Sequence, residues 1–224
     1  MNTLLDRPVW ASLLHAPHLA EGGDLARRYR RDVNLFASAR DDGAASLAAL
    51  AALVGAGESV YLAQVAPVQV PPGLQLVRSA QGVQMLAMRA VAPVGGPQDV
   101  VVLGEADAPE MLALAQLTEP GPFLPRTHSM GRFVGVRIDG RLAAMAGERM
   151  RFAGATEVSG VCTHPDFRGR GLARRLSSVV AHAIQQRGEQ AFLHAWVSNR
   201  AAITLYEGLG FETRTEIQVA VLGR

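Results

Sequence analysis

The sequence contains no lysine, because all 22 of its basic residues are arginine. This absence excludes a Schiff-base lysine and the phosphate-binding lysine of a Walker loop. Against 20 acidic residues the net charge is only +2, which is too small to indicate a nucleic-acid-binding protein or a polybasic membrane anchor. We therefore expect neither nucleic acid nor a membrane among its partners.

Cysteine is nearly absent as well. The single Cys162 excludes internal disulfides and metal sites built from cysteine, and the six histidines are scattered, so we expect no metal. No apolar run reaches the roughly 18 residues that a membrane span requires. Asp6 stands where a signal peptide would have its basic region. These absences predict a cytoplasmic protein.

The composition is that of a globular chain, with 49% hydrophobic and 19% charged residues. Residues 1–98 are rich in alanine, glycine and proline and show few motifs, whereas the patterns sharpen from residue 99 onward. The run 91–97, with two prolines and two glycines, is the best linker. We therefore expect a divergent N-terminal α/β region at 1–98 and a second domain at 99–224.

The second domain shows alternating strand and helix patterns. Asp139-Gly140 is a strong hairpin signal, and apolar residues recur at helical spacing over 171–187. The full prediction has strands at 59–63, 83–90, 100–103, 133–138, 142–150, 157–163, 191–197 and 218–222, and helices beginning near 46, 107, 171 and 199. Together they predict an α/β fold with a mixed sheet and helices on its faces.

A turn rich in glycine and arginine, residues 168–171, lies between the strand at 157–163 and the following helix. Such a turn directs free backbone N–H groups and the positive end of the helix at one point, which favours a phosphate or diphosphate. Gly169 and Gly171 let a ligand approach the backbone. A dinucleotide fingerprint would need a glycine where Arg174 stands. The alternative is a plain turn with solvated arginines.

Two motifs together resemble the GNAT superfamily of acyl-CoA-dependent N-acyltransferases. Residues 168–173, Arg-Gly-Arg-Gly-Leu-Ala, match its Arg/Gln-x-x-Gly-x-Gly/Ala signature. Residues 199–211 are similar to its Asn-x-x-Ala-x-x-x-Tyr-x-x-x-Gly-Phe segment, in family order and spacing. The resemblance covers residues 100–222 and implies a GNAT-like acyl-CoA N-acyltransferase fold there. Residues 1–98 are more weakly similar to glycine N-acyltransferase-like relatives, and a degenerate copy of the same fold is an alternative for them.

The resemblance implies acetyl-CoA as a co-substrate and assigns residues to its parts. In the family, the strand ahead of the turn splays from its neighbour, and its backbone bonds the pantetheine arm. The resemblance gives that role to Val161, Cys162 and Thr163. The turn amides that would hold the diphosphate are those of Arg168, Gly169, Arg170, Gly171, Leu172 and Ala173. Asn199 would bond the pantetheine or the acyl region. We interpret the Cys162 side chain as a small buried hydrophobe, because no histidine partner is indicated.

The resemblance also implies the acid–base groups. Tyr206 would protonate the departing thiolate, with a core aromatic as the alternative. Glu148 and Glu157 lie on strands that should face the acyl group, so each is a candidate base, although either can equally be a surface or hairpin residue. Carbonyl groups of the split strand can share the task of orienting the amine.

The sequence therefore predicts an enzyme that transfers an acetyl (acyl) group from CoA to an amine by direct attack in a ternary complex. We expect the acceptor to be a small-molecule amine or an amino acid, held beneath the loop 119–126 and the first half. The rival hypothesis is a catalytically inactive acyl-CoA-binding sensor, which does not need Tyr206. An exposed final strand can pair with a second subunit, which allows a homodimer.

Overall fold

The computed structural model describes residues 3–95 and 99–224 of the chain. Within these ranges it contains two β-sheets and five α-helices, joined by loops and short 3-10 helices. The strands are β1 (Ala20–Gly22), β2 (Ala26–Tyr29), β3 (Ala37–Ala39), β4 (Ser59–Gln64), β5 (Gln75–Ala87), β6 (Val100–Leu103), β7 (Phe133–Ile138), β8 (Arg141–Phe152), β9 (Ala155–Thr163), β10 (Gln190–Trp196) and β11 (Phe211–Gly223). The helices are α1 (Pro8–His15), α2 (Ala44–Ala52), α3 (Ala108–Thr118), α4 (Leu172–Gln186) and α5 (Arg200–Glu207).

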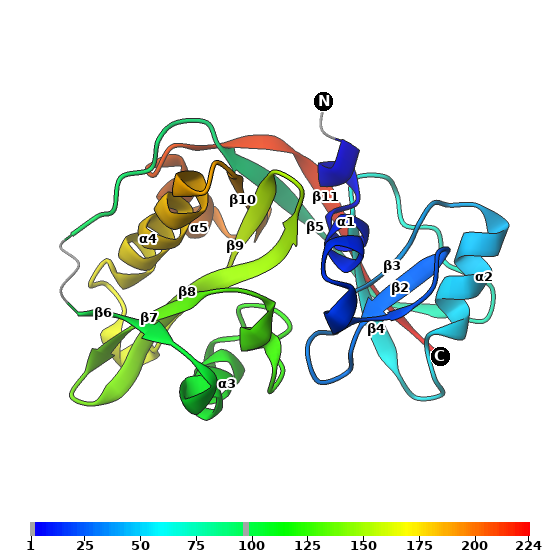
Figure 1. Cartoon of the computed structure of the whole chain (residues 1–224), viewed down its shortest axis with the longest axis horizontal. Helices are drawn as coiled ribbons and strands as arrows, with labels where there is room; N and C mark the ends of the chain where they lie inside the picture. The colour runs from blue at the N-terminus through cyan, green and yellow to red at the C-terminus, as the bar shows by residue number, and fades with distance from the viewer. Residues whose placement is uncertain (1–2, 96–98) are drawn as a thin grey trace.

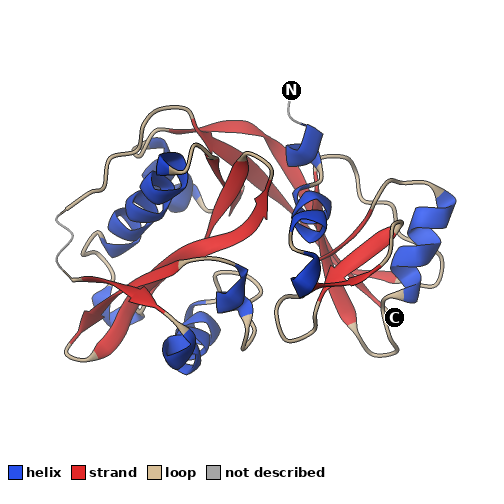
Figure 2. Cartoon of the chain, in the orientation of Figure 1, coloured by secondary structure: helices blue, strands red, loops and turns tan. Residues whose placement is uncertain are grey.

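The larger sheet has eight strands in the order β4-β11-β5-β10-β9-β8-β7-β6, and β1-β2-β3 form a small second sheet (Figure 1). Every neighbouring pair in the large sheet is antiparallel except β9 and β10, which are parallel. The predicted α/β fold with a mixed sheet is therefore confirmed (Figure 2).

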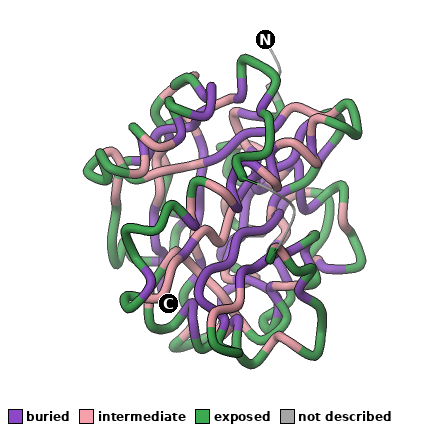
Figure 3. The backbone as a smooth tube through the Cα atoms, turned by 90° about the vertical axis from the view of Figure 1, so that its left-hand side faces the viewer, coloured by how far each residue is buried: buried purple, intermediate pink, exposed green. Residues whose placement is uncertain are grey.

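Helices cover both faces of the large sheet. On the α4–α5 face, Leu176 and Val180 of α4 pack in one core with Val158 and Leu193 of the strands. On the opposite α1–α3 face, α3 and α1 pack in two further cores, one containing Phe133 and the other Phe192. Leu172, Leu176, Val180 and Ile184 recur every four residues, so one stripe of α4 is buried. Figure 3 shows the buried segments running through the centre of the molecule.

The large sheet takes strands from both halves of the sequence, because β4 and β5 precede residue 98 and both pair with β11. The division at 98/99 stays a prediction, and residue 98 itself lies outside the described residues. Of the linker predicted at 91–97, positions 96 and 97 also lie outside them. The described part is bonded to α4: Val91 N donates to Gln185 Oε1 at 2.8 Å and Val94 N donates to Ser178 Oγ at 2.8 Å.

The final strand differs from the sequence-based expectation. It begins at Phe211 rather than near residue 218, and it pairs with β4 on one side and β5 on the other. It therefore offers no free edge, and the argument for a homodimer through this strand was wrong; the sheet's edge strands are β4 and β6. No helix in the described ranges is both long and apolar enough to cross a membrane.

Candidate active site

The two parallel strands β9 and β10 separate partway along their length. They pair only at Ala155–Gln190, Thr156–Ala191 and Glu157–Phe192. Beyond Glu157 the described chain has no further pairing between them, so the β10-side backbone groups of residues 158–163 have no partner in a neighbouring strand. The split that the family resemblance implied is therefore present, and it opens next to Val161, Cys162 and Thr163.

A β-bulge in β9 accompanies the split. Met145 pairs with Cys162 and Gly147 with Ser159, so β9 advances three residues while β8 advances two. Gly160 lies in this bulge with φ +62°, a conformation that favours glycine. A Cβ on Gly160 would lie 2.9 Å from the Phe133 ring. Both the backbone angle and the close aromatic ring therefore require glycine where β9 bends away from β10.

The turn after β9 leaves the beginning of α4 open. Gly169 and Gly171 have φ of +77° and +72°, and a Cβ built on either would meet nothing within 4 Å. Residues 168–171 are exposed, so the free N–H groups of the first helical turn can bind an anion there. An open hollow of about 430 Å³ adjoins this turn and is lined by Val94, Gly95, Asp99, Arg170, Gly171, Arg174 and Arg175. A larger hollow of about 710 Å³ adjoins the other end of α4, and no predicted site residue lines it.

The structure gathers the predicted cofactor residues at one end of the sheet. Because β9 and β10 are parallel, the helices that follow them, α4 and α5, begin at the same end. Asn199 caps α5, with its side-chain oxygen accepting a hydrogen bond from Ala202 N at 3.2 Å. Thr163 Oγ1 is buried and has no hydrogen-bond partner among the described residues. An extended amide ligand lying in the split would supply one, so the residues present fit a pantetheine arm.

Tyr206 and Cys162 are both buried, and burial keeps both groups protonated near neutral pH. Burial raises the pKa of Tyr206 to about 12, against an opposing influence of the Ser177 hydroxyl. The phenol therefore keeps its proton near neutral pH. Burial likewise raises the pKa of the Cys162 thiol to about 11, so this cysteine is not a thiolate nucleophile at neutral pH.

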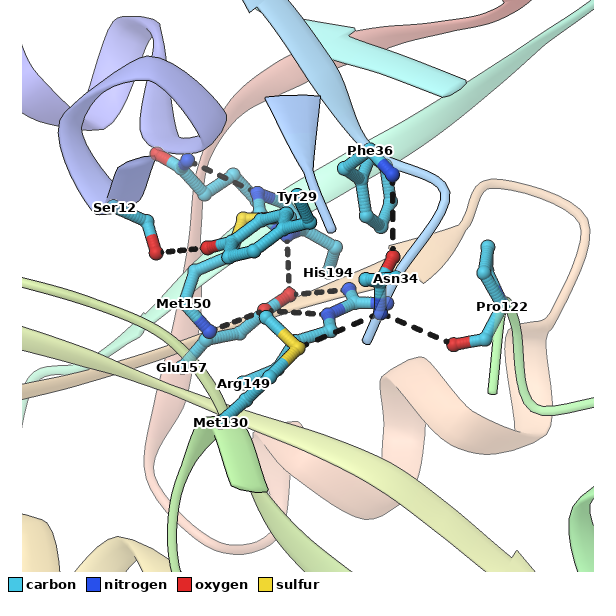
Figure 4. A network of polar contacts seen from close by, with 11 residues as sticks. Ser12, Tyr29, Asn34, Phe36, Pro122, Met130, Arg149, Met150, Glu157 and His194 are labelled. Atoms are coloured by element: carbon cyan, nitrogen blue, oxygen red, sulfur yellow. Dashed lines mark hydrogen bonds and ion pairs between the residues drawn. The ribbon is translucent and has the colours of Figure 1, made fainter. Parts of the chain in front are cut away.

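Glu157 is the centre of a buried polar network on the α1–α3 face (Figure 4). Arg149 donates to its two carboxylate oxygens, from Nε to Oε2 at 2.9 Å and from Nη2 to Oε1 at 2.7 Å. His194 Nδ1 lies 2.8 Å from Oε1. Burial alone would raise the pKa of Glu157, but the charge and hydrogen bonds of Arg149 and the bond from His194 outweigh it and lower the pKa to about 2. The carboxylate is therefore ionised and fully engaged.

The partners of His194 fix its tautomer. Gln84 Oε1 accepts from Arg214 at 2.9 Å, and Gln84 Nε2 donates to Leu5 O at 2.9 Å, so the orientation of the amide is determined. The same Nε2 lies 3.1 Å from His194 Nε2, which must then be the acceptor. His194 consequently carries its proton on Nδ1 and donates it to Glu157.

Glu148 lies on the other face of the sheet. It pairs in register with Val158, which packs against α4, and its Oε1 accepts from Arg187 Nη1 at 2.9 Å near the end of α4. The two predicted base candidates are thus not brought together. Glu157 lies at the point where the strands separate, whereas Glu148 is held at the end of α4 remote from the glycine–arginine turn.

The first half of the chain contacts the loop 119–126. Arg126 N donates to Asp32 O at 2.9 Å, and Thr127 Oγ1 donates to Val33 O at 2.6 Å. Asn34 Nδ2 lies 3.4 Å from Pro122 O (Figure 4). Beneath the loop, a cavity of only about 10 Å³ remains, lined by Pro120, Gly121, Pro122, Phe123, Thr127, Phe133, Arg149, Ser159 and Gly160. The α1–α3 side of the split is therefore covered by both segments.

Sequence reasoning missed most of this network. Arg149 directly follows the candidate base Glu148 in the sequence. His194 alternates with Phe192 and Trp196 along β10, but no sequence signal pairs it with Arg149. Among the described residues, no cluster of three or more His, Cys, Asp or Glu side chains could hold a metal.

Comparison with known proteins agrees with this geometry. The family model described as FR47-like protein matches residues 133–219. A [ribosomal protein bS18]-alanine N-acetyltransferase of Salmonella typhimurium is 30% identical over 122 residues, which are 52% of this chain and 82% of that protein. A GNAT-family protein from Novosphingobium aromaticivorans is 46% identical over 98% of both chains, with a TM-score of 0.91. A GCN5-related N-acetyltransferase from Kribbella flavida, 18% identical over 100% of this chain and 96% of that one, shares the fold with a TM-score of 0.63. The chain therefore belongs to the GNAT superfamily of N-acetyltransferases.

Proposed function

We propose that this N-acetyltransferase transfers the acetyl group of acetyl-CoA to a small-molecule amine by direct attack within a ternary complex. The observation that carries the proposal is the separation of β9 from β10 after Glu157, which opens beside the exposed start of α4. When bound, acetyl-CoA supplies the activated acetyl thioester. GNAT acetyltransferases use this co-substrate, and the split and the turn together fit an extended molecule with a diphosphate.

Three groups of residues would bind different parts of acetyl-CoA. The unpaired backbone of Val161, Cys162 and Thr163 would bond the amide-containing arm, and the turn amides of residues 168–173 would bond the diphosphate at the helix start. Asn199 would contribute its remaining amide N–H groups near the acyl region, since its oxygen already caps α5.

Tyr206 would act as the proton donor. As the carbon–nitrogen bond forms and the carbon–sulfur bond breaks, the sulfur takes the electron pair, and the Tyr206 O–H would protonate it. The surplus proton of the acceptor nitrogen then restores the phenol through water. Glu157 is a weak proton acceptor with a pKa of about 2, and Glu148 faces away. Water and the free carbonyl groups of β9 are therefore better suited to receive and orient the amine than either carboxylate.

The acceptor would approach from the α1–α3 face, because α4, α5 and their core fill the other one. On that face the loop 119–126 and residues 32–36 are bonded to each other. Because these two segments cover the α1–α3 side of the split, the arrangement supports a small amine as the acceptor rather than a protein. The Salmonella relative is named for a ribosomal protein, so the alternative for this chain is a protein N-terminus.

Thermal unfolding with acetyl-CoA, ATP and NAD tests the cofactor. Ligand at about 100 times Kd adds ~2.7 kcal/mol, which is on the order of 5–10 °C for a chain of this size. We expect a shift with acetyl-CoA alone. Thiol release would then be measured with amino acids and small amines against a peptide with an N-terminal alanine. Turnover with the peptide alone would overturn the small-molecule proposal.

The Tyr206→Phe variant tests catalysis. We expect turnover to fall by about 10²-fold or more, the typical contribution of a general acid, with acetyl-CoA affinity unchanged. Arg168→Ala is the matched comparison, because it keeps the backbone amide but removes a positive charge beside the proposed diphosphate site. It should weaken acetyl-CoA binding and leave the rate at saturation close to that of the parent. Full turnover in Tyr206→Phe would contradict the proposed acid role, and binding of acetyl-CoA without turnover of any amine would favour the sensor hypothesis.

A further inference from the structure

The Phe133 ring lies beside the split although Phe133 belongs to β7. β8 separates β7 from β9 in the sheet (Figure 1), and the ring crosses β8 where Gly147 has no side chain. A Cβ on Gly147 would lie 2.6 Å from Phe133 Cε1, and a Cβ on Gly160 of β9 would lie 2.9 Å from the same atom. Both distances are far below the roughly 3.5–4.0 Å at which carbon atoms pack. The two glycines therefore make room for the ring at the bulge where β9 bends away from β10.

A second aromatic ring closes the same space from the loop 119–126. Phe123 meets Phe133 edge to face, with ring centroids 5.7 Å apart and planes at 85°. The two rings, together with Ser159 and Gly160, line the cavity of about 10 Å³ beneath the loop. This volume is close to the minimum that holds one water molecule, and a methyl group is of similar size. The cavity can therefore receive a methyl group, but neither a longer chain nor an acceptor amine.

The cavity adjoins the inner end of the split. The turn 168–171, which would bind the diphosphate, lies at the open end, whereas β9 and β10 last pair at Glu157. An extended arm that runs from this turn into the split would end beside Ser159 and Gly160. Because α4, α5 and their core fill the opposite face, a group at the end of the arm would project toward the α1–α3 face, where the cavity lies.

We propose that Phe133 determines the acyl-chain length of the co-substrate and limits it to the two carbons of an acetyl group. This inference rests on the proposed function, since it requires an acyl-CoA in the split. Phe133 is only 2% exposed and is held between the glycines of β8 and β9 on one side and Phe123 on the other. A longer acyl chain would have to displace this packed ring, and extra methylene groups in a packed site are unfavourable.

Titration calorimetry with CoA, acetyl-CoA and propionyl-CoA tests the binding preference, and thiol release with the best amine from the acceptor screen gives kcat/KM. In the parent, propionyl-CoA should be at least about tenfold worse than acetyl-CoA by both measures, the usual effect of one methylene group in a confined apolar site. In Phe133→Leu this preference should fall by about tenfold, because leucine is smaller than phenylalanine. The Kd of CoA should not change, since CoA has no acyl group to enter the cavity.

A second variant and a matched control separate this role from a general loss of packing. Phe123→Ala opens the same cavity from a partly buried loop position and should also reduce the preference for acetyl-CoA. Phe152→Leu is the control, because Phe152 is likewise 2% exposed and packs against another ring, that of Phe192, at 5.5 Å. Phe152 pairs with Ala155, where β9 and β10 are still joined. Its replacement should lower Tm and leave the preference for acetyl-CoA unchanged.

The opposing outcomes are distinct. Equal Kd and kcat/KM for acetyl-CoA and propionyl-CoA in the parent overturn the inference and leave the proposed function intact. An unaltered preference in both Phe133→Leu and Phe123→Ala, or an equal loss of preference in Phe152→Leu, also overturns it. If the parent binds neither CoA nor any thioester, the proposed function itself is wrong.

Discussion

Replacing Arg149 by methionine should destabilise the protein and reverse the acid dependence of its stability. Arg149 and Glu157 are 12% and 1% exposed and form two hydrogen bonds. A carboxyl whose pKa falls from 4.5 to about 2 is stabilised by roughly 3 kcal/mol. Breaking a buried pair typically costs about 3–5 kcal/mol. We therefore expect Arg149→Met to lose about 3–5 kcal/mol at pH 7. The guanidinium carbon of Arg149 lies 4.9 Å from the centroid of the Phe36 ring, and methionine is long enough to cover the same ring.

The sign of the pH effect distinguishes this explanation from simple packing loss. In the parent protein the pKa of Glu157 is lower in the folded state, so its contribution is present above about pH 4.5 and is lost as the pH falls toward 2. In Arg149→Met the buried carboxylate lacks its cation, so burial raises the pKa of Glu157 above its value in the unfolded chain and the folded state takes up a proton there. Its stability should then increase as the pH falls from 8 to about 5.

Urea unfolding followed by circular dichroism between pH 4 and 8 measures both effects. Arg126→Met is the matched control, because the side chains of Arg126 and Asp32 are 51% and 49% exposed and such a pair contributes about 0–1 kcal/mol. A loss below about 1 kcal/mol in Arg149→Met, or a decline in its stability toward acid over this range, would refute the reasoning.

Two further substitutions test the strand that forms the split. Gly160→Ala should lower Tm and weaken acetyl-CoA binding. A non-glycine residue in the left-handed conformation costs about 1–2 kcal/mol, and the new Cβ would lie 2.9 Å from the Phe133 ring. Differential scanning calorimetry measures the change in Tm, and titration calorimetry measures the change in acetyl-CoA affinity. Gly140→Ala, with φ +76° and open space around its Cβ, is the control and should lose stability alone. Cys162→Ala should keep turnover close to that of the parent in the thiol-release assay, and a loss above tenfold would contradict a backbone-only role for Cys162.

The sequence predicted the elements whose signals are local. The hairpin at Asp139-Gly140, the apolar stripe of α4 and the two glycine-containing motifs each depend on residues close together in the chain, and the structure has β7–β8, α4 and the turn at these places. β11 was predicted too short because its first residues, such as Glu212 and Thr213, are polar. They pair with β5 through the backbone, which needs no alternation of apolar side chains.

The polar network could not be predicted for a different reason. Glu157, Arg149 and His194 come from three strands, and the bulge that places both Arg149 and Met150 opposite Glu157 is a property of strand register. Residues from the first half, including Tyr29 and Asn34, complete the surroundings from more than a hundred positions away in the sequence. Composition and periodicity contain no information on such distant pairs.

The position of β11 between β4 and β5 has a consequence for the order of folding. β4 and β5 do not pair with each other; each pairs with β11, which follows every other strand of the sheet along the chain. During synthesis, the early strands must therefore wait until β11 leaves the ribosome before β4 can join the sheet. Contacts of such large sequence separation slow folding, and the early strand edges remain exposed to other chains in the interval. A chaperone that holds the nascent N-terminal half until β11 emerges would shorten that exposure.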